Sequence, residues 1–230
     1  MMWMDVENIT LTINDSSVSG REGMTILEVA KENGIDIPTL CYIPELSPTG
    51  ACRICVVEVE GSRALVAACH TPIAQGMVIR THSPKVLETR KTIVELLMAS
   101  HCGFCMICEK ANICDLRKIA ADLEVGLPRF ETEKRFYQIE DVSPYVQRDM
   151  SKCVLCWKCI RACREIAKKN VYGTAYRGFD AKVVVDCDQP LNKEVCRDCG
   201  ICINYCPTGA LTRPKKLGEE KKGKPLVISS

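Results

Sequence analysis

Cysteine is the residue type best suited to chemistry in this sequence, because its thiolate binds soft metals and iron–sulfur clusters. The chain has 17 cysteines in 230 residues. All but Cys187 fall into four groups, which are Cys41, Cys52, Cys55 and Cys69; Cys102, Cys105, Cys108 and Cys114; Cys153, Cys156, Cys159 and Cys163; and Cys196, Cys199, Cys202 and Cys206. The first ten residues carry acids and lack the apolar stretch of a secretory signal, so the cysteines indicate metal binding and not disulfides.

The third and fourth groups repeat one spacing. Each has two residues between successive cysteines and three before the last, and Pro207 follows the fourth group. In two-cluster ferredoxins, the last cysteine of each run ligates the cluster of the other run. The spacing therefore assigns one 4Fe–4S cluster to Cys153, Cys156, Cys159 and Cys206, and another to Cys196, Cys199, Cys202 and Cys163. The alternative is a pair of structural zinc sites, but zinc motifs usually separate two pairs of cysteines by a spacer.

The first group has a wider spacing, with ten, two and thirteen residues between its cysteines. This is not the plant-type ferredoxin spacing, and on spacing alone a zinc site competes with a 2Fe–2S cluster. The surrounding residues favour the cluster. Apolar and polar residues alternate over 8–14, as in a half-buried strand, and residues 56–59 suggest a further strand. Thr25 and Glu28 form a capping box that would start a helix, and Gly34 would end this helix. We therefore expect a β-grasp ferredoxin domain with a 2Fe–2S cluster.

The second group lies beside a histidine. His101, Cys105, Cys108 and Cys114 supply an imidazole and three thiolates, which can hold a 4Fe–4S cluster, and a neutral histidine ligand generally raises the cluster potential. Cys102 offers an all-cysteine set in place of His101. The spacing does not choose between these two residues.

These groups predict an α+β chain built from small cluster-binding units. We expect a β-grasp 2Fe–2S domain over residues 1–82, a small helical His/Cys 4Fe–4S domain over 83–122, a connector over 123–144, a two-cluster ferredoxin-type domain over 145–212 and a basic tail over 213–230. The second unit would begin at Ser83 and Pro84, a helix cap followed by a proline in the first turn. Its apolar stripe would be Val86, Ile93, Val94 and Leu97.

Charge and hydropathy exclude other classes of protein. The net charge of +2 excludes a chain that strongly seeks polyanions, so no nucleic-acid partner is expected. No apolar run approaches the ~18 residues of a membrane span, and we expect a cytoplasmic protein without membrane insertion. Lys158, Arg161 and Arg164 are interpreted as solvated helix charges, although they could also raise a cluster potential or contact an acidic partner. Trp157 is expected to shield a cluster from water.

The order of these motifs resembles a known family. It is similar to the N-terminal region of the large iron–sulfur subunit of respiratory complex I and to the accessory-cluster region of iron-only hydrogenases. A chain of this length is most similar to the small diaphorase iron–sulfur (gamma) subunit of NAD-linked nickel–iron hydrogenases. The segments Ile-Pro-Thr-Leu-Cys at 37–41 and Cys-Arg-Ile-Cys at 52–55 strengthen the match, which covers about residues 8–212.

The resemblance implies that His101 is the ligand, that Cys102 is spare and that Cys187 has no part in the pattern. It implies one 2Fe–2S cluster and three 4Fe–4S clusters. The chain would be a non-catalytic electron-transfer subunit without a substrate site. It would relay electrons between a flavin subunit that handles NAD(H) or NADP(H) and a catalytic partner such as a nickel–iron hydrogenase. Alternative partners are a formate dehydrogenase or a ferredoxin-dependent bifurcating complex, and a zinc-binding structural adaptor is a remote alternative.

Overall fold

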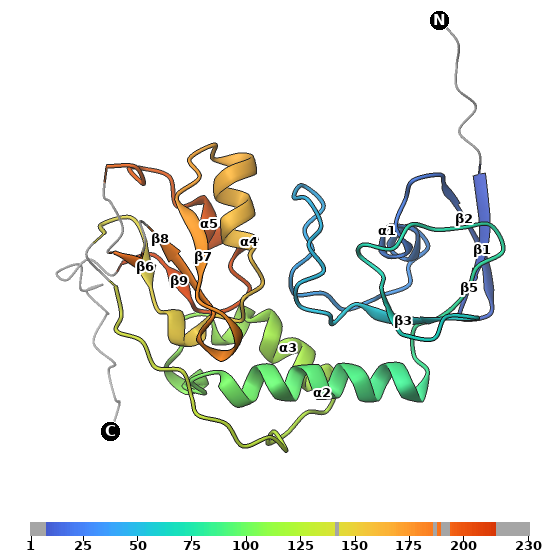
Figure 1. Ribbon diagram of the computed structural model, residues 1–230, viewed down its shortest axis with the longest axis horizontal. Coiled ribbons are helices and arrows are strands. Elements are labelled where there is room, and N and C mark those ends of the chain that lie inside the picture. Colours follow the sequence, from blue (N-terminus) through green and yellow to red (C-terminus); the bar gives the residue numbers. More distant parts are fainter. Residues whose placement is uncertain (1–7, 141–142, 186–187, 190–193, 215–230) are drawn as a thin grey trace, which may run out of the picture.

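The computed structural model describes residues 8–140, 143–185, 188–189 and 194–214. Cys187 and positions 215–230 of the predicted tail lie outside these ranges. Helices and strands are mixed along the chain, as the α+β prediction requires. Figure 1 shows a sheet with one helix at one end of the molecule, short strands and helices at the other, and a long helix along the lower edge that connects them.

The first part is a five-stranded mixed sheet with one helix. Its elements are β1 (Asn8–Ile13), β2 (Ser16–Arg21), α1 (Ile26–Glu32), β3 (Val56–Val59), β4 (Val66–Ala67) and β5 (Val78–Arg80). The strand order is β2-β1-β5-β3-β4. The β1–β2 hairpin is antiparallel, whereas β1 and β5 are parallel. A mixed sheet with one helix packed against it is the expected β-grasp arrangement.

Helix α1 begins and ends where the sequence predicts. The Thr25 hydroxyl accepts a hydrogen bond from the Glu28 N–H at 3.3 Å, and the Glu28 carboxylate accepts one from the Thr25 N–H at 2.8 Å. Gly34, just beyond the helix, has a φ of +71°, a conformation that glycine adopts without steric penalty. Ile26 and Val29 are fully buried against the sheet. Local capping therefore sets the helix limits, and burial of one face orients the helix.

The long helix α2 (Pro84–Ser100) starts at the predicted cap, where the Ser83 hydroxyl accepts from the Val86 N–H. Val86 and Val94 of the expected stripe are fully buried. Arg90 lies in the same stripe and is only 1% exposed, which the sequence did not predict. Its guanidinium donates to the carbonyl of Val56 in β3 at 2.8 Å. This bond ties the helix to the sheet next to Cys55.

Short helices follow α2. They are the 3-10 turns η1 (Cys105–Ile107) and η2 (Ala111–Ile113) and the helix α3 (Asp115–Asp122). Residues 123–139 form no helix or strand, and Glu140 makes an isolated bridge to Arg148. None of the helices in the described ranges combines the length and apolar character needed to cross a membrane.

The last part contains two short antiparallel pairs, β6 with β9 and β7 with β8. Its elements are β6 (Gln147–Arg148), η3 (Met150–Lys152), α4 (Lys158–Arg161), the π-helical turn η4 (Ala162–Ile166), β7 (Tyr172–Ala175), η5 (Gly178–Asp180), β8 (Lys182–Val185), α5 (Ile201–Tyr205) and β9 (Leu211–Thr212). The valines at 183–185 lie in β8 and are buried, as the sequence suggested.

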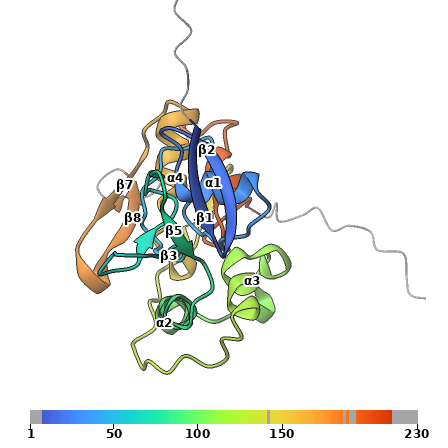
Figure 2. The ribbon, with the colours of Figure 1, turned by 90° about the vertical axis from the view of Figure 1, so that its right-hand side faces the viewer.

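One apolar core is shared by the three parts. It joins the loop after α1, helix α2, helix α3 and the loop before α4, and its members are Leu40, Cys41, Cys52, Ile54, Val94, Leu116, Ile119, Ala120, Leu123, Val154 and Cys156. Figures 1 and 2 both show α2 and α3 together on the lower side of the molecule. The three parts are therefore packed on one another and are not merely strung along a linker.

The packing of β2 against α1 leaves no space for a side chain at Gly20. A Cβ there would lie 2.5 Å from Val29 Cγ2 and 2.9 Å from Ile73 Cδ1. Gly20→Ala is therefore expected to lower the free energy of unfolding by about 1–3 kcal/mol, measured by guanidinium unfolding followed by circular dichroism. Gly126→Ala is the matched control, because a Cβ at Gly126 meets open space. Equal stability of the Gly20→Ala variant and the unmodified chain would contradict the prediction.

Candidate metal centres

The first site gathers all four cysteines of the first group. Cys41, Cys52, Cys55 and Cys69 are each buried. Hydrogen bonds from the thiols of Cys52 and Cys69 lower the pKa of Cys41, and a hydrogen bond with Cys69 lowers the pKa of Cys55 to about 7. The four sulfur atoms therefore form one contact network. They come from the loop after α1, the turn before β3 and the residues after β4, so the β-grasp fold brings them together.

The third site combines residues from both ends of the last part. A small cavity is lined by Cys153, Cys156, Cys159 and Cys206, together with Trp157 and apolar side chains. Burial raises the pKa of Cys153 to about 11 and that of Cys156 to about 12. These thiols are thus neutral without metal, and metal binding would have to displace their protons.

The fourth site combines the last cysteine of the third run with the first three cysteines of the fourth run. Its cavity is lined by Cys163, Cys196, Cys199 and Cys202. Burial raises the pKa of Cys202 to about 11, and the neighbouring charges that raise it further belong to the other three cysteines. The fold thus brings Cys163 to the fourth run and Cys206 to the third, the exchange that the repeated spacing predicts. Ligation of a cluster by these sets stays a prediction.

Backbone geometry repeats in the two loops. Leu155 and Trp157 have φ values of 52° and 57°, and Asp198 and Gly200, at the equivalent positions of the other run, have 53° and 66°. A left-handed residue turns the chain sharply, and alternation with right-handed residues forms concave anion-binding loops. Both loops are therefore shaped alike, and α4 and α5 begin directly after Trp157 and Gly200.

The second site is more open. A cavity of about 460 Å³ is lined by His101, Cys105 and Cys114 and by mostly apolar neighbours from α3 and the connector. Cys108 and Cys105 lie close enough for their charges to raise the pKa of Cys114, after the larger effect of burial. Burial is the largest effect that lowers the pKa of His101, and the positive charges of Lys134 and Lys152 lower it further. The imidazole is therefore held neutral, the form that binds a metal.

Cys102 occupies a different position. It is 7% exposed and does not line the cavity of the second site. Its sulfur lies 3.9 Å from Nδ1 of His101, and the same nitrogen accepts a hydrogen bond from the Gly103 N–H at 3.2 Å. Cys102 thus lies beside the imidazole, with its own N–H bonded to the carbonyl of Ser151.

The third site adjoins the second through contacts that the sequence analysis missed. A Cβ on Gly209 would lie 2.6 Å from the Cys108 sulfur, so only glycine permits this approach. Lys110 donates to the carbonyls of Ile203 at 2.9 Å and Cys206 at 3.2 Å. The glycine three residues after Cys206 was the available signal, but its partner is 101 positions away in the chain.

Two of the three cations near the third site are buried, which corrects our interpretation of them as solvated helix charges. Lys158 is 4% exposed and Arg161 is 2% exposed. The Lys158 ammonium lies 3.8 Å from the carboxylate of Asp115 in α3. Only Arg164 is solvated, with a side chain that is 62% exposed. The helical pattern of four residues was too short to show which side of α4 faces the core.

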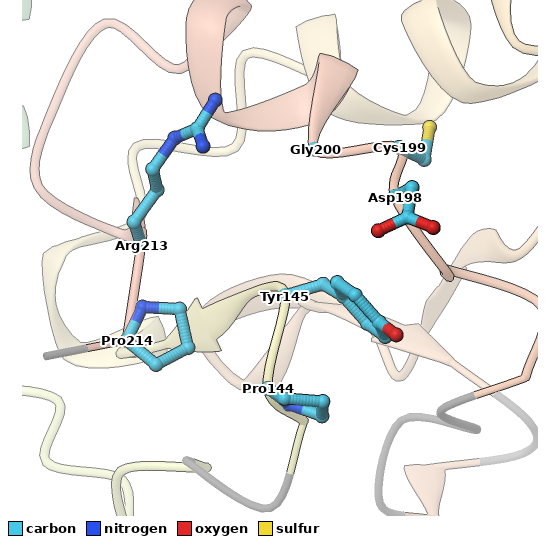
Figure 3. Close-up of a pocket in the computed structure, with 7 residues that line it drawn as sticks. All are labelled: Pro144, Tyr145, Asp198, Cys199, Gly200, Arg213 and Pro214. Carbon is cyan, nitrogen blue, oxygen red and sulfur yellow. The ribbon is translucent and has the colours of Figure 1, made fainter. Parts of the chain in front are cut away.

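Another cavity, of about 520 Å³, lies beside the fourth site. Figure 3 shows its lining of Pro144, Tyr145, Asp198, Cys199, Gly200, Arg213 and Pro214, with the sulfur of Cys199 directed away from Tyr145. Because its lining contains one cysteine, this cavity is not one of the four candidate metal centres. Within the described residues, no three His, Cys, Asp or Glu side chains converge closely enough to hold a single metal ion.

The donor sets fit iron–sulfur clusters by their chemistry. Three sites each gather four cysteines, and the second brings an imidazole and two cysteines to one cavity, with Cys108 near Cys114; imidazole and thiolate are the ligands found on such clusters. Most of these groups are buried or half-buried among apolar side chains.

Comparison with known proteins identifies three matching regions along the chain. Three family models match the chain: "2Fe-2S iron-sulfur cluster binding domain" over residues 6–84, "NADH-ubiquinone oxidoreductase-G iron-sulfur binding region" over 90–129, and "NADH-quinone oxidoreductase subunit 3, ferredoxin-like domain" over 143–212. The first match favours a 2Fe–2S cluster over zinc in the first site.

Individual relatives are longer than this chain. The chain is 38% identical to the NADP-reducing hydrogenase subunit HndD of Solidesulfovibrio fructosivorans, over 92% of this chain and 37% of that protein. It is 34% identical to the NADH-ubiquinone oxidoreductase 75 kDa subunit of Reclinomonas americana, over 89% of this chain and 29% of that protein. The chain thus spans well under half the length of these two curated relatives.

A solved structure matches over nearly its whole length. The crystal structure of an NAD+-reducing [NiFe]-hydrogenase in the H2-reduced state contains a chain with a TM-score of 0.76 and 30% identity, over 88% of this chain and 86% of that one. The chain therefore belongs to the family of iron–sulfur subunits that includes this hydrogenase subunit and the iron–sulfur regions of HndD and of the 75 kDa subunit.

Proposed function

We propose that this chain is the electron-transfer subunit of a multisubunit NAD(P)-linked oxidoreductase. It relays electrons between a flavin subunit that handles NAD(H) or NADP(H) and a catalytic partner such as a nickel–iron hydrogenase. The observation that carries the proposal is that four separate sites for cluster ligands lie against one another in a single fold. The similarity to a chain of an NAD+-reducing [NiFe]-hydrogenase supports this choice of partner.

The chain's residues hold the sites in a branched arrangement centred on the third site. The shared core joins Cys41 and Cys52 of the first site to Cys156 of the third. The close approach of Gly209 to Cys108 and the bonds of Lys110 join the second site to the third. The continuous α4–η4 segment carries ligands of both the third and the fourth site and joins these two. Bound clusters would supply one-electron transfer chemistry at each site.

The proposed ligands are those predicted from the sequence and its resemblance. They are Cys41, Cys52, Cys55 and Cys69 for one 2Fe–2S cluster; His101, Cys105, Cys108 and Cys114 for a 4Fe–4S cluster; Cys153, Cys156, Cys159 and Cys206 for a second; and Cys163, Cys196, Cys199 and Cys202 for a third. Apolar side chains pack around the cysteines of the third and fourth sites and limit the access of water to them. The proposed boundaries of the units are residues 82, 122, 144 and 212.

The proposal is tested by the composition and reactivity of the isolated chain. Purified without oxygen, it should hold roughly 14 iron atoms and as many acid-labile sulfides, two from one cluster and four from each of three. Dithionite should bleach its visible absorption, whereas NADH and NADPH alone should not. Zinc in place of iron would refute the iron–sulfur assignment. Bleaching by NADH without a flavin subunit would refute the proposal that a separate subunit handles NAD(P)H.

The exchange of Cys163 and Cys206 has its own test. If Cys163 and Cys196 serve the same cluster, the Cys163→Ala/Cys196→Ala variant should lose about four iron atoms, no more than Cys196→Ala alone. The Cys163→Ala/Cys153→Ala variant should lose about eight, because its two positions serve different clusters. Iron analysis and electron paramagnetic resonance (EPR) of the reduced proteins provide the measurements. The reverse result, with the larger loss in the first pair, would show that each run serves its own cluster.

The ligand at the second site is tested by two single changes. His101→Ala should abolish or strongly alter the EPR signal of this cluster, because the imidazole lines the cavity. Cys102→Ser should retain the cluster with all four iron atoms, because the Cys102 sulfur lies at Nδ1 of the imidazole, the nitrogen that already accepts from the Gly103 N–H. Loss of the cluster in Cys102→Ser, with a normal signal in His101→Ala, would make Cys102 the ligand.

A further inference from the structure

Arg161 occupies an unusual position between two proposed cluster sites. It lies on α4 between Cys159 and Cys163, yet its side chain is directed away from its own helix into the loop of the first site. It is 2% exposed. Its Nη2 donates to the carbonyl of Cys41 at 2.5 Å and to the carbonyl of Cys156 at 3.5 Å. One guanidinium group therefore bonds the backbone of a proposed ligand from each of two sites.

The same loop is held at a second point. Nη1 of Arg161 donates to the carbonyl of Ser47, while the Glu165 carboxylate accepts from the Ser47 N–H at 2.8 Å and from its hydroxyl at 2.6 Å. The segment from Cys41 to Ser47 thus docks on the α4–η4 segment through several bonds. Removal of Arg161 alone would leave the Glu165 contacts in place.

The charge of Arg161 is not balanced by a direct ion pair. Among the described residues, no carboxylate forms an ion pair with it, and its Nε has no hydrogen-bond acceptor. The charge of Arg161 contributes to the lowered pKa of Glu165, but the larger cause is the pair of hydrogen bonds from Ser47, to which that carboxylate is committed. By contrast, the equally buried Arg148 is paired with Glu140 at 2.7 Å.

Burial of a cation without a direct counter-charge is strongly unfavourable, because the interior solvates charge poorly. The first and third sites offer a compensating charge, because the carbonyls of Cys41 and Cys156 that Arg161 bonds belong to residues of their proposed ligand sets. Thiolates bound to a cluster would carry negative charge on the same residues whose carbonyls this guanidinium bonds. The buried cation and the two ligand sets therefore complement each other.

We propose that Arg161 is a positioning residue that joins the first and third sites and raises the reduction potential of the cluster in each. This inference rests on the proposed function, because it requires clusters at both sites. Reduction adds negative charge to a cluster, and a nearby buried cation stabilises that charge because the interior screens it weakly. The forked guanidinium bonds the carbonyls of Cys41 and Cys156 through Nη2 and that of Ser47 through Nη1, and a single ammonium nitrogen does not reproduce this fork.

The test is an EPR-monitored redox titration of the full chain, loaded with iron and sulfide without oxygen. Arg161→Gln should lower the potentials of the first and third clusters. At a fixed potential, the ratio of reduced to oxidised cluster should fall at least tenfold, which corresponds to about 59 mV for one electron. The signals of the second cluster should keep their potential. Arg164→Gln is the matched control, because Arg164 is solvated on the same helical segment, and it should leave all potentials unchanged.

Arg161→Lys separates charge from geometry and remains informative if Arg161→Gln loses its clusters. The ammonium keeps the charge but lacks the second arm of the fork, which bonds Ser47, so both potentials should fall, but by less than in Arg161→Gln. Unchanged potentials at both clusters in a fully loaded Arg161 variant would overturn the inference, as would an equal shift in Arg164→Gln. If the unmodified chain itself held no iron and sulfide, the proposed function would fail instead.

Discussion

The apolar core between the cysteine loops is the constraint on which the other features depend. Leu40, Val94, Leu116 and Val154 come from four separate segments and meet in it, together with the cysteines of two sites. Because close packing fixes the positions of its members, this core sets how the first and third sites face each other. Packing and site geometry are therefore one problem in this chain, and a change in the core would move sulfur atoms as well as methyl groups.

The electrostatics of the interior follow from the same packing. Burial raises the pKa of Cys153 and Cys156, so these thiols resist ionisation on their own. Among the residues that the structure describes, the buried Arg90 and Arg161 form no ion pair with a carboxylate, and the Nε of each has no hydrogen-bond acceptor. In a medium of low dielectric constant, ionisation of a buried thiol is unfavourable. Burial of a cation without a neighbouring anion is unfavourable for the same reason. Both conditions are relieved if the cysteines ionise together on a metal cluster.

Much of the local structure could be predicted from the sequence. The limits of α1 and the start of α2 follow from capping residues, and β1 follows from alternation, because both kinds of signal act over a few positions. The buried cations could not be predicted, because charged residues on a short helix are solvated unless a distant segment covers them. Arg161 is covered by residues 114 and 120 positions away in the sequence. Gly209 was missed for the same reason.

The sequence by itself determined which residues can bind metal, how they are spaced in each loop and where the capped helices begin, since all of these depend on near neighbours in the chain. The repeated spacing was also enough to indicate that Cys163 and Cys206 exchange places. Only the tertiary structure decided that Cys102 lies beside the imidazole, that the third site is the one in contact with the others, and that Arg161 links two sites. These relations depend on side chains far apart in sequence that share one buried volume, which no local pattern specifies.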